Sequence, residues 1–212
     1  MQIECEDGQS HELPAYVIST GNSDSSFFAK VVIGEHLSIL CTVSTSPALQ
    51  ASSSPLQLIL HPPSLSSQHG KLHRALLSSL QLDSLEKTKL TVSLSVLLNN
   101  TSFEISHHLL NVATIGLLAS GTPLSRCIFA SSCFTSREGE IVSEQFALKA
   151  KLTEQAILAK GFGAGIGGGI VGFSVAGREG ERDTTRLLSF LVAAANKVGK
   201  EIFAYFKLKE EA

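Results

Sequence analysis

The chain has 212 residues, of which 43% are apolar and 17% are charged, and its formal net charge is −2. This length allows one large domain or two small ones, and the apolar fraction can bury a sizeable core. The net charge argues against a strongly basic nucleic-acid-binding protein, although it leaves room for a local basic patch. The charged fraction is low for a free-standing surface, which indicates that partners cover part of it or that Ser and Thr solvate it.

Targeting and redox signals are few. No apolar run approaches the ~18 residues that a membrane-spanning helix needs, so we expect no membrane contact. No N-terminal apolar run resembles a signal peptide, and the four cysteines form no Cys-x-x-Cys motif. We therefore expect a reduced intracellular compartment, in which the cysteines are packing residues.

The first third of the chain is rich in predicted strands. Residues 1–14 are polar and predict a loose arm or an edge strand. A short strand is expected at 15–19 and a loop at 20–26. Two β-rich runs on either side of Gly34-Glu35 then predict a hairpin. The strands of this hairpin are 27–33 and 36–44, followed by a Ser-rich loop at 45–55 and a strand at 56–60.

The middle of the chain predicts a strand, a buried helix and another strand. Apolar and polar residues alternate over 90–98, which is typical of a strand with one buried face. Residues 104–120 are apolar over most of a helical circumference, so this helix should be buried on more than one side. Gly121-Thr122-Pro123 ends it, and 127–134 reads as a buried strand. These elements predict one right-handed βαβ unit.

A first helix and a C-terminal region complete the prediction. The helix is expected at 71–82, before the central strand. Asp183 is a candidate N-cap for a long terminal helix. Further strands are expected at 145–152, 155–159 and 169–176. The simplest fold class is one α+β domain over residues 1–212, with N-terminal β-hairpins, a central βαβ unit and a long C-terminal helix.

The glycine cluster contains a nucleotide-binding pattern in an unfavourable context. Residues 163–168 formally contain Gly-x-Gly-x-x-Gly. A dinucleotide site needs a helix that opens directly from this loop, but a β-rich run follows it here. A flexible hairpin loop or a close backbone approach is the favoured interpretation. A nucleotide-binding module that uses Gly163–Gly168 remains an alternative.

The histidines give no clear metal motif. His69 and His73 have helical i, i+4 spacing, but a zinc site needs three or four ligands and no Cys-His cluster supplies the others. They are expected to be ordinary surface histidines. His107 and His108 diverge by about 100° around a helix, so we expect that they cannot share one ligand site. The sequence therefore predicts no metal site and no cofactor.

Basic residues supply the candidate binding residues. Lys71 and Arg74 lie on the first predicted helix, and Arg178 and Arg182 lie after the glycine cluster. Charge alone could bring phosphates to the second pair, although a solvated turn is its favoured interpretation. These four residues are the candidate binding residues of the chain.

Residues 90–133 resemble the ribonuclease PH family. The family has a strand, an Asn-containing apolar helix that ends in a Gly-x-Pro turn, and a small-residue strand. The matching segments are 92–100, 110–124 and 128–133, and the register of Asn111, Gly121 and Pro123 is fairly specific. The hairpin at 28–43 and the region from 168 to the terminal helix are more weakly similar to the family. With these pieces the resemblance covers most of the chain.

The chain departs from the family at the residues that the resemblance would make catalytic. Active members have an Arg-rich first helix, an Arg-bearing turn and paired aspartates after the small-residue strand. Here the first helix has only Arg74, the turn at 99–103 has no arginine, and no aspartate lies between Asp83 and Asp183. Phosphorolysis needs cations that hold phosphate, and an acid or metal at the leaving oxygen. No catalytic residue is therefore assigned.

The resemblance implies a ring subunit of the eukaryotic RNA exosome core that is not an enzyme. Such a subunit would support 3′–5′ RNA processing and degradation by organising an RNA channel. The implied partners are other ribonuclease PH-like ring subunits, RNA-binding cap subunits and RNA. Lys71, Arg74, Arg178 and Arg182 are then the candidates for RNA contact. The implied locations are the nucleus, nucleolus and cytoplasm. The main rival is an active phosphate-dependent 3′–5′ exoribonuclease in which Glu140 or Glu144 replaces aspartate.

Overall fold

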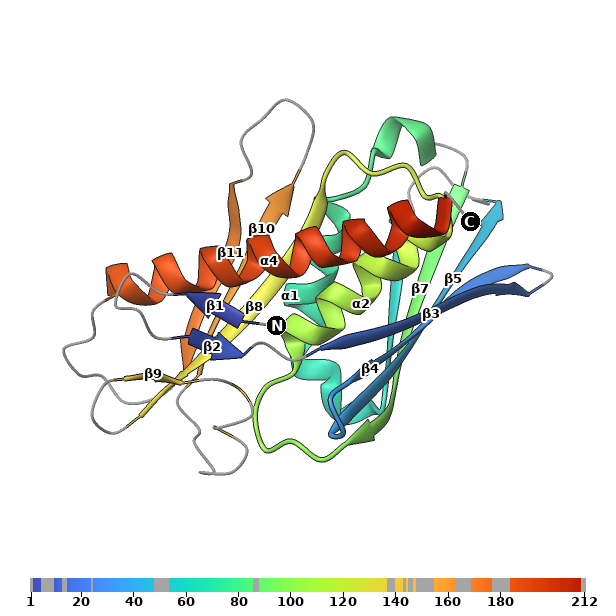
Figure 1. Cartoon of the computed structure of the whole chain (residues 1–212). Helices are drawn as coiled ribbons and strands as arrows, with labels where there is room; N and C mark the ends of the chain where they lie inside the picture. The colour runs from blue at the N-terminus through green and yellow to red at the C-terminus, as the bar shows by residue number, and fades with distance from the viewer. Residues whose placement is uncertain are drawn as a thin grey trace.

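The computed structural model describes most of the chain (Figure 1). The described residues are 2–4, 10–12, 15–23, 25–47, 54–85, 88–136, 140–142, 144, 147, 155–162, 169–176 and 184–210. The glycine segment 163–168, Arg178, Arg182 and the predicted N-cap Asp183 lie outside these residues, as does Cys5. Most of the predicted strand 145–152 lies outside them too, and Ala147, its one described residue, is helical.

A five-stranded sheet contains most of the N-terminal half. Its strand order is β3-β4-β5-β7-β6, and only β6 and β7 pair in parallel. The predicted hairpin is present, with Gly34 at φ 56° between β4 and β5. This backbone angle favours glycine because it has no Cβ. The strand bounds are β3 Tyr16–Ser23, β4 Ser26–Ile33, β5 Leu37–Pro47, β6 Leu56–His61 and β7 Thr88–Asn99.

A four-stranded antiparallel sheet contains the strands of the C-terminal half, in the order β11-β10-β8-β9. Near the N-terminus, β1 and β2 form a separate antiparallel pair, so the strand alternative for residues 1–14 is the correct one. The strand bounds are β8 Cys127–Thr135, β9 Ile141–Val142, β10 Gln155–Phe162, β11 Ile170–Ala176, β1 Gln2–Glu4 and β2 Ser10–Glu12.

Within the described ranges, the helices α1, α2 and α4 cover and separate the sheets. The helix α1 (Ser66–Leu77) packs on β6 and on α2 (Ser106–Ala119), which lies between the two sheets (Figure 1). The long helix α4 (Thr184–Glu210) crosses β8 and β10. Short 3₁₀ turns lie at Pro63–Leu65 and Leu82–Leu85. None of the helices in the described ranges is long and apolar enough to cross a membrane.

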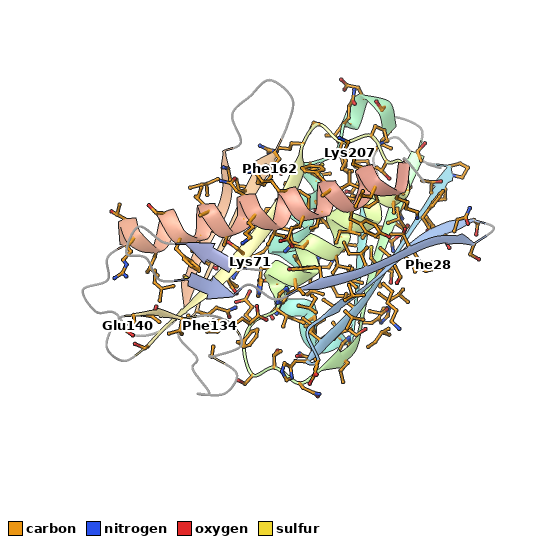
Figure 2. All side chains as sticks on the ribbon, viewed as in Figure 1. Phe28, Lys71, Phe134, Glu140, Phe162 and Lys207 are labelled. Atoms are coloured by element: carbon orange, nitrogen blue, oxygen red, sulfur yellow. The ribbon has the colours of Figure 1, made fainter. Side chains whose placement is uncertain are left out.

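The helix α2 is buried on several sides, as its sequence predicts. All residues from Ser106 to Leu117 are buried, and side chains from both sheets fill the space around the helix (Figure 2). Gly116 faces β5, where an added Cβ would lie 2.5 Å from Cys41 Sγ. Cys41 and Cys133 are buried free thiols, and burial raises the pKa of each to about 12, so both behave as packing residues.

The predicted succession of strand, helix and strand is present, but its two strands do not form a single-sheet βαβ unit. The strands β7 and β8 flank α2 in sequence and belong to different sheets. The parallel crossover of the fold is instead β6, α1 and β7. The expectation was wrong because an apolar pattern shows that a strand is buried and does not show which strand it pairs with.

Two other boundaries also differ from the prediction. The expected loop 20–26 is mostly strand, because β3 runs to Ser23 and pairs with β4 along its whole length. The first helix begins at Ser66 and ends at Leu77, earlier than the predicted 71–82. Pro63 lies in the 3₁₀ turn before it, where proline needs no amide partner.

The close packing of α2 on β5 makes a prediction about two helical glycines. Gly116→Ala should reduce the free energy of unfolding by about 1–3 kcal/mol, because the new methyl group overlaps Cys41. Gly70→Ala in α1 is the matched control, since nothing lies within 4 Å of its added Cβ. This control should raise stability by about 0.5–1 kcal/mol. Urea unfolding of both variants measures the difference, and equal effects would contradict the packing.

Candidate functional site

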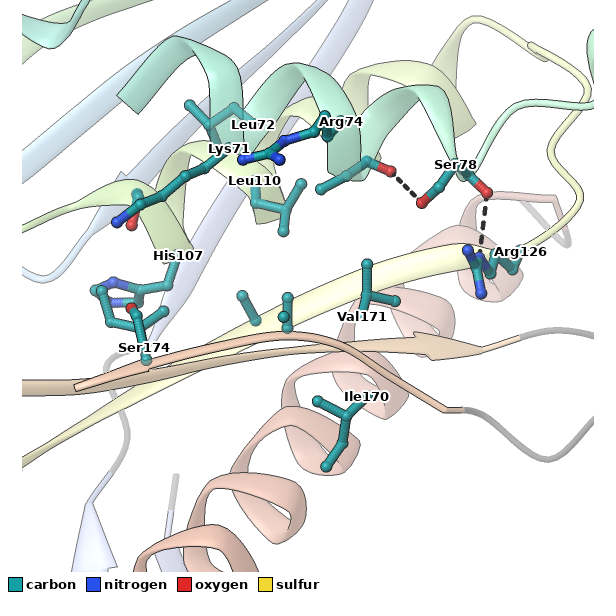
Figure 3. Close-up of a pocket in the computed structure, with 16 residues that line it drawn as sticks. Lys71, Leu72, Arg74, Ser78, His107, Leu110, Arg126, Ile170, Val171 and Ser174 are labelled. Carbon is teal, nitrogen blue, oxygen red and sulfur yellow. Dashed lines mark hydrogen bonds between the residues drawn. The ribbon is translucent and has the colours of Figure 1, made fainter. Parts of the chain in front are cut away.

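A cavity of about 650 Å³ lies between α1, the start of α2 and the four-stranded sheet (Figure 3). Lys71 and Arg74 reach it from α1, while Val171 and Ser174 line it from β11 on the opposite side. His107 lines it from α2. The cavity therefore collects residues from segments that lie more than 100 positions apart in the chain.

The charged side chains that line the cavity are basic. Lys71, Arg74 and Arg126 line it, and no described lining residue is a carboxylate. Arg126 Nε donates a hydrogen bond to the Ser78 carbonyl oxygen at 3.1 Å, which holds the guanidinium at one end of the cavity (Figure 3). Lys71 is largely exposed, with Nζ 4.0 Å from Glu104 Oε1. Three cations without a lining acid favour an anion in this space.

Two of the four candidate RNA-binding residues thus lie together. Lys71 and Arg74 share the cavity, and the Arg74 Nε donates only to the Gly70 carbonyl oxygen of its own helix at 3.3 Å. Arg126 was missed from the sequence because it is a lone arginine between the Gly-Thr-Pro turn and β8. The sequence signal that could have identified Arg126 is its position just after the Gly-Thr-Pro turn.

Beside the cavity, two histidines of α2 converge on one carboxylate. His108 Nε2 lies 2.8 Å from Glu144 Oε1, and His107 Nε2 lies 3.6 Å from Glu144 Oε2. Their side chains are 2%, 1% and 10% exposed for His107, His108 and Glu144. The expectation that the adjacent histidines cannot share one site was wrong. The Cα–Cβ directions of neighbours diverge, but the long imidazole side chains bring the Nε2 atoms back together; the ring centroids are 3.8 Å apart.

A buried hydrogen-bond network fixes the tautomer of His108. Asn111 Nδ2 donates to Tyr16 Oη at 2.9 Å and to the Ala130 carbonyl oxygen, while its Oδ1 accepts from the Ala130 amide. Because Tyr16 Oη accepts from Asn111, it is free to donate to His108 Nδ1, 2.8 Å away. His108 then carries its proton on Nε2 and donates it to Glu144.

The electrostatics of the cluster follow from its burial. The pKa of His107 is lowered to about 4, chiefly by burial and then by the neighbouring His108, against the opposing effect of Glu144. Burial alone raises the pKa of Glu144, but the two histidines and their hydrogen bonds outweigh burial and hold it well below its usual range. Burial also raises the pKa of Tyr16, so the phenol stays neutral.

The other predicted site residues have structural contacts. His69 Nε2 and His73 Nε2 lie 3.0 Å and 3.2 Å from the carbonyl oxygens of Leu58 and Leu56 on β6. These histidines are half-buried rather than free on the surface, and they attach α1 to the sheet. Glu140 is exposed, and its amide donates to Ser136 Oγ.

Asn111 and Thr114 bind the part of the β8 edge that lies beyond its pairing with β9. The short strand β9 pairs only with Phe134 and Thr135. Further along, Asn111 bonds both backbone groups of Ala130, and Thr114 Oγ1 donates to the Ile128 carbonyl oxygen at 2.7 Å. Two side chains of α2 thus satisfy backbone groups that would otherwise be buried without partners.

Comparisons with known proteins identify the fold. No protein-family model matches the chain, and no curated protein matches it. Rice (Oryza sativa) Rrp46 has a similar structure, with a TM-score of 0.79 and 19% identity, over 95% of this chain and 99% of the rice chain. An archaeal exosome core structure matches with a TM-score of 0.67 and 12% identity, over 92% of this chain and 90% of that chain. The chain therefore has the ribonuclease PH-like fold, as its sequence resemblance implies.

The role of Asn111 can be tested by truncation. Asn111→Ala should lower the free energy of unfolding by about 2–4 kcal/mol, because it leaves the buried amide and carbonyl of Ala130 without partners. Asn100→Ala is the control, since that side chain is exposed, and it should change stability by no more than about 0.5 kcal/mol. Chemical unfolding measures both, and a neutral Asn111→Ala would show that the β8 edge finds other partners.

Proposed function

We propose that the chain is a non-catalytic subunit of an exosome-type core ring, which supports RNA processing and degradation through its assembly. The observation that carries this proposal is the match over nearly the full length of both this chain and rice Rrp46. The similar archaeal structure is an exosome core. A fold that matches over nearly the whole of each chain supports a role as a subunit of the same kind of assembly.

The composition of the cavity supports the non-catalytic part of the proposal. Phosphorolysis needs a phosphate held by cations together with an acid or a metal at the leaving oxygen. The cavity has the cations Lys71, Arg74 and Arg126, but none of its described lining residues is an acid. The Glu144 carboxylate is 10% exposed and engaged by two imidazoles. An active phosphorolytic enzyme is therefore the less favoured interpretation. The other alternative, a nucleotide-binding module that uses Gly163–Gly168, lies outside the described residues.

Exposed apolar side chains support the presence of partners. Val17 and Phe27 are exposed on β3 and β4, Leu97 and Leu98 on β7, and Leu208 near the end of α4. The first strand of the five-stranded sheet, β3, is also an edge strand, and no further strand within the described residues pairs with its outer side. We infer that other ribonuclease PH-like subunits cover such surfaces, with RNA-binding cap subunits and RNA as further partners in the nucleus, nucleolus and cytoplasm.

Recovery of a tagged copy of the chain from its native cells tests the assembly. The expected result is a complex of several different ribonuclease PH-like chains together with RNA-binding chains, identified by mass spectrometry. A monomer, or a complex that contains only copies of this chain, would contradict the proposal. Tagging the N-terminus and the C-terminus in separate experiments controls for interference by the tag, because both tagged chains should recover the same complex.

RNA contact at the cavity can be tested by charge removal in the purified assembly. The double variant Lys71→Gln, Arg74→Gln should weaken binding of a single-stranded RNA and reduce the slope of log K against log salt by about 1.4, since each lost phosphate contact removes about 0.7. The control Lys30→Gln, Lys200→Gln removes two exposed lysines that do not line the cavity. Equal slopes for both double variants would place the RNA elsewhere.

A further inference from the structure

Two imidazoles and one carboxylate, each no more than 10% exposed, come together at the start of α2. In the part of the chain that the structure describes, His107, His108 and Glu144 form a group whose ligand-type atoms all lie within 4.8 Å of one another. The two histidines are adjacent in the first turn of α2, and Glu144 comes from the helical segment after β9. Nothing in the proposed ring function requires this group.

We propose that His107 Nε2, His108 Nε2 and the Glu144 carboxylate bind one divalent transition metal ion, for which zinc is the best fit. In a tetrahedral site with bonds of 2.0–2.2 Å, neighbouring ligand atoms lie about 3.4 Å apart. His108 Nε2 lies 2.8 Å from Glu144 Oε1 and His107 Nε2 lies 3.6 Å from Glu144 Oε2, on either side of that value. One ligand atom from each of the three residues lies within 4.8 Å of the other two, so side-chain rotations that bring these atoms to about 3.4 Å from one another would admit the ion.

The ligand set selects the class of metal. Two neutral imidazoles and one carboxylate suit zinc, cobalt, nickel and iron, whereas magnesium and calcium prefer oxygen ligands. Entry of the ion displaces the proton that His108 Nε2 shares with Glu144, and this proton leaves to solvent. The ion also compensates the buried charge of Glu144. Ser132 Oγ is hydrogen-bonded to His107 Nε2 at 3.1 Å, and the ion would replace this bond at that nitrogen.

The surroundings of His108 are those of a supported metal ligand. Metal-binding histidines usually hold their second ring nitrogen in a hydrogen bond, which fixes the ring and the tautomer. His108 Nδ1 bonds Tyr16 Oη, which is itself held by Asn111. Nε2 of His108 is therefore aimed at Glu144 before any ion arrives. Among the described residues, His107 Nδ1 is buried without a hydrogen-bond partner, so His107 lacks the second-nitrogen support that His108 has.

The burial of the ligands assigns this metal a structural role. With all three side chains 10% exposed or less, the ion would join the first turn of α2 to the segment that carries Glu144. That junction lies beside the basic cavity, because His107 lines it. The inference does not depend on the ring proposal, and a metal-binding chain outside any ring would still satisfy it.

Zinc titration of the full chain tests the site. The chain is first freed of metal with a chelator and then titrated with zinc against a chromophoric competitor. One zinc ion per chain should bind with a sub-micromolar Kd and raise the Tm. Glu144→Gln and His108→Gln should each weaken binding by at least about 100-fold, and Tyr16→Phe by about 10-fold. Magnesium should produce no shift in Tm.

The second histidine pair supplies a matched control. The double variant His69→Gln, His73→Gln removes two stacked imidazoles whose ring centroids are 5.8 Å apart, and it should bind zinc as the unaltered chain does. If the ligand variants do not fold, X-ray absorption on the zinc-loaded unaltered chain decides the question. The expected shell contains nitrogen and oxygen at about 2.0–2.2 Å, with no sulfur at about 2.3 Å. Absence of stoichiometric binding, a sulfur shell, or loss of binding in the His69–His73 variant would overturn the proposal.

Discussion

The hydrogen bonds from α2 to the uncovered edge of β8 are the constraint on which the rest of the structure depends. A strand edge buried without a partner would leave backbone amides and carbonyls unsatisfied, at a cost of about 1–3 kcal/mol each. Asn111 and Thr114 remove that cost on one side of the helix, while Gly116 lets the opposite side approach β5. One helix therefore holds together two sheets that share no strand pairing.

The helix α2 also positions the basic cavity and the buried group of His107, His108 and Glu144. Its first turn presents His107 to the basic cavity and His107 with His108 to Glu144. Asn111, one turn further on, orders Tyr16 and through it His108. A residue that seals the strand edge thus also sets the tautomer of the buried cluster. Asn111 is needed for packing whether or not any reaction takes place in the cavity.

Much of the fold could be predicted from the sequence, but the pairing and the site could be predicted only in part. Period-2 alternation over 90–98 predicted a strand correctly, since it records which face is buried. It did not show that β7 and β8 belong to different sheets, because pairing is decided by distant residues. The sequence showed that the first helix carries the basic residues Lys71 and Arg74. It did not predict the cavity that brings them together with Arg126. The joint site of His107 and His108 was wrongly excluded, since backbone direction alone says little about the tips of long side chains.

The central claim is that a ribonuclease PH-like fold persists here without phosphorolytic chemistry. The most direct measurement is the release of nucleoside diphosphates from RNA by the purified chain, and by its native assembly, with and without inorganic phosphate. The account predicts no phosphate-dependent release that depends on this chain. Phosphate-dependent release that is lost on Glu140→Gln or Glu144→Gln, with the assembly intact, would contradict it and would identify the chain as an active exoribonuclease.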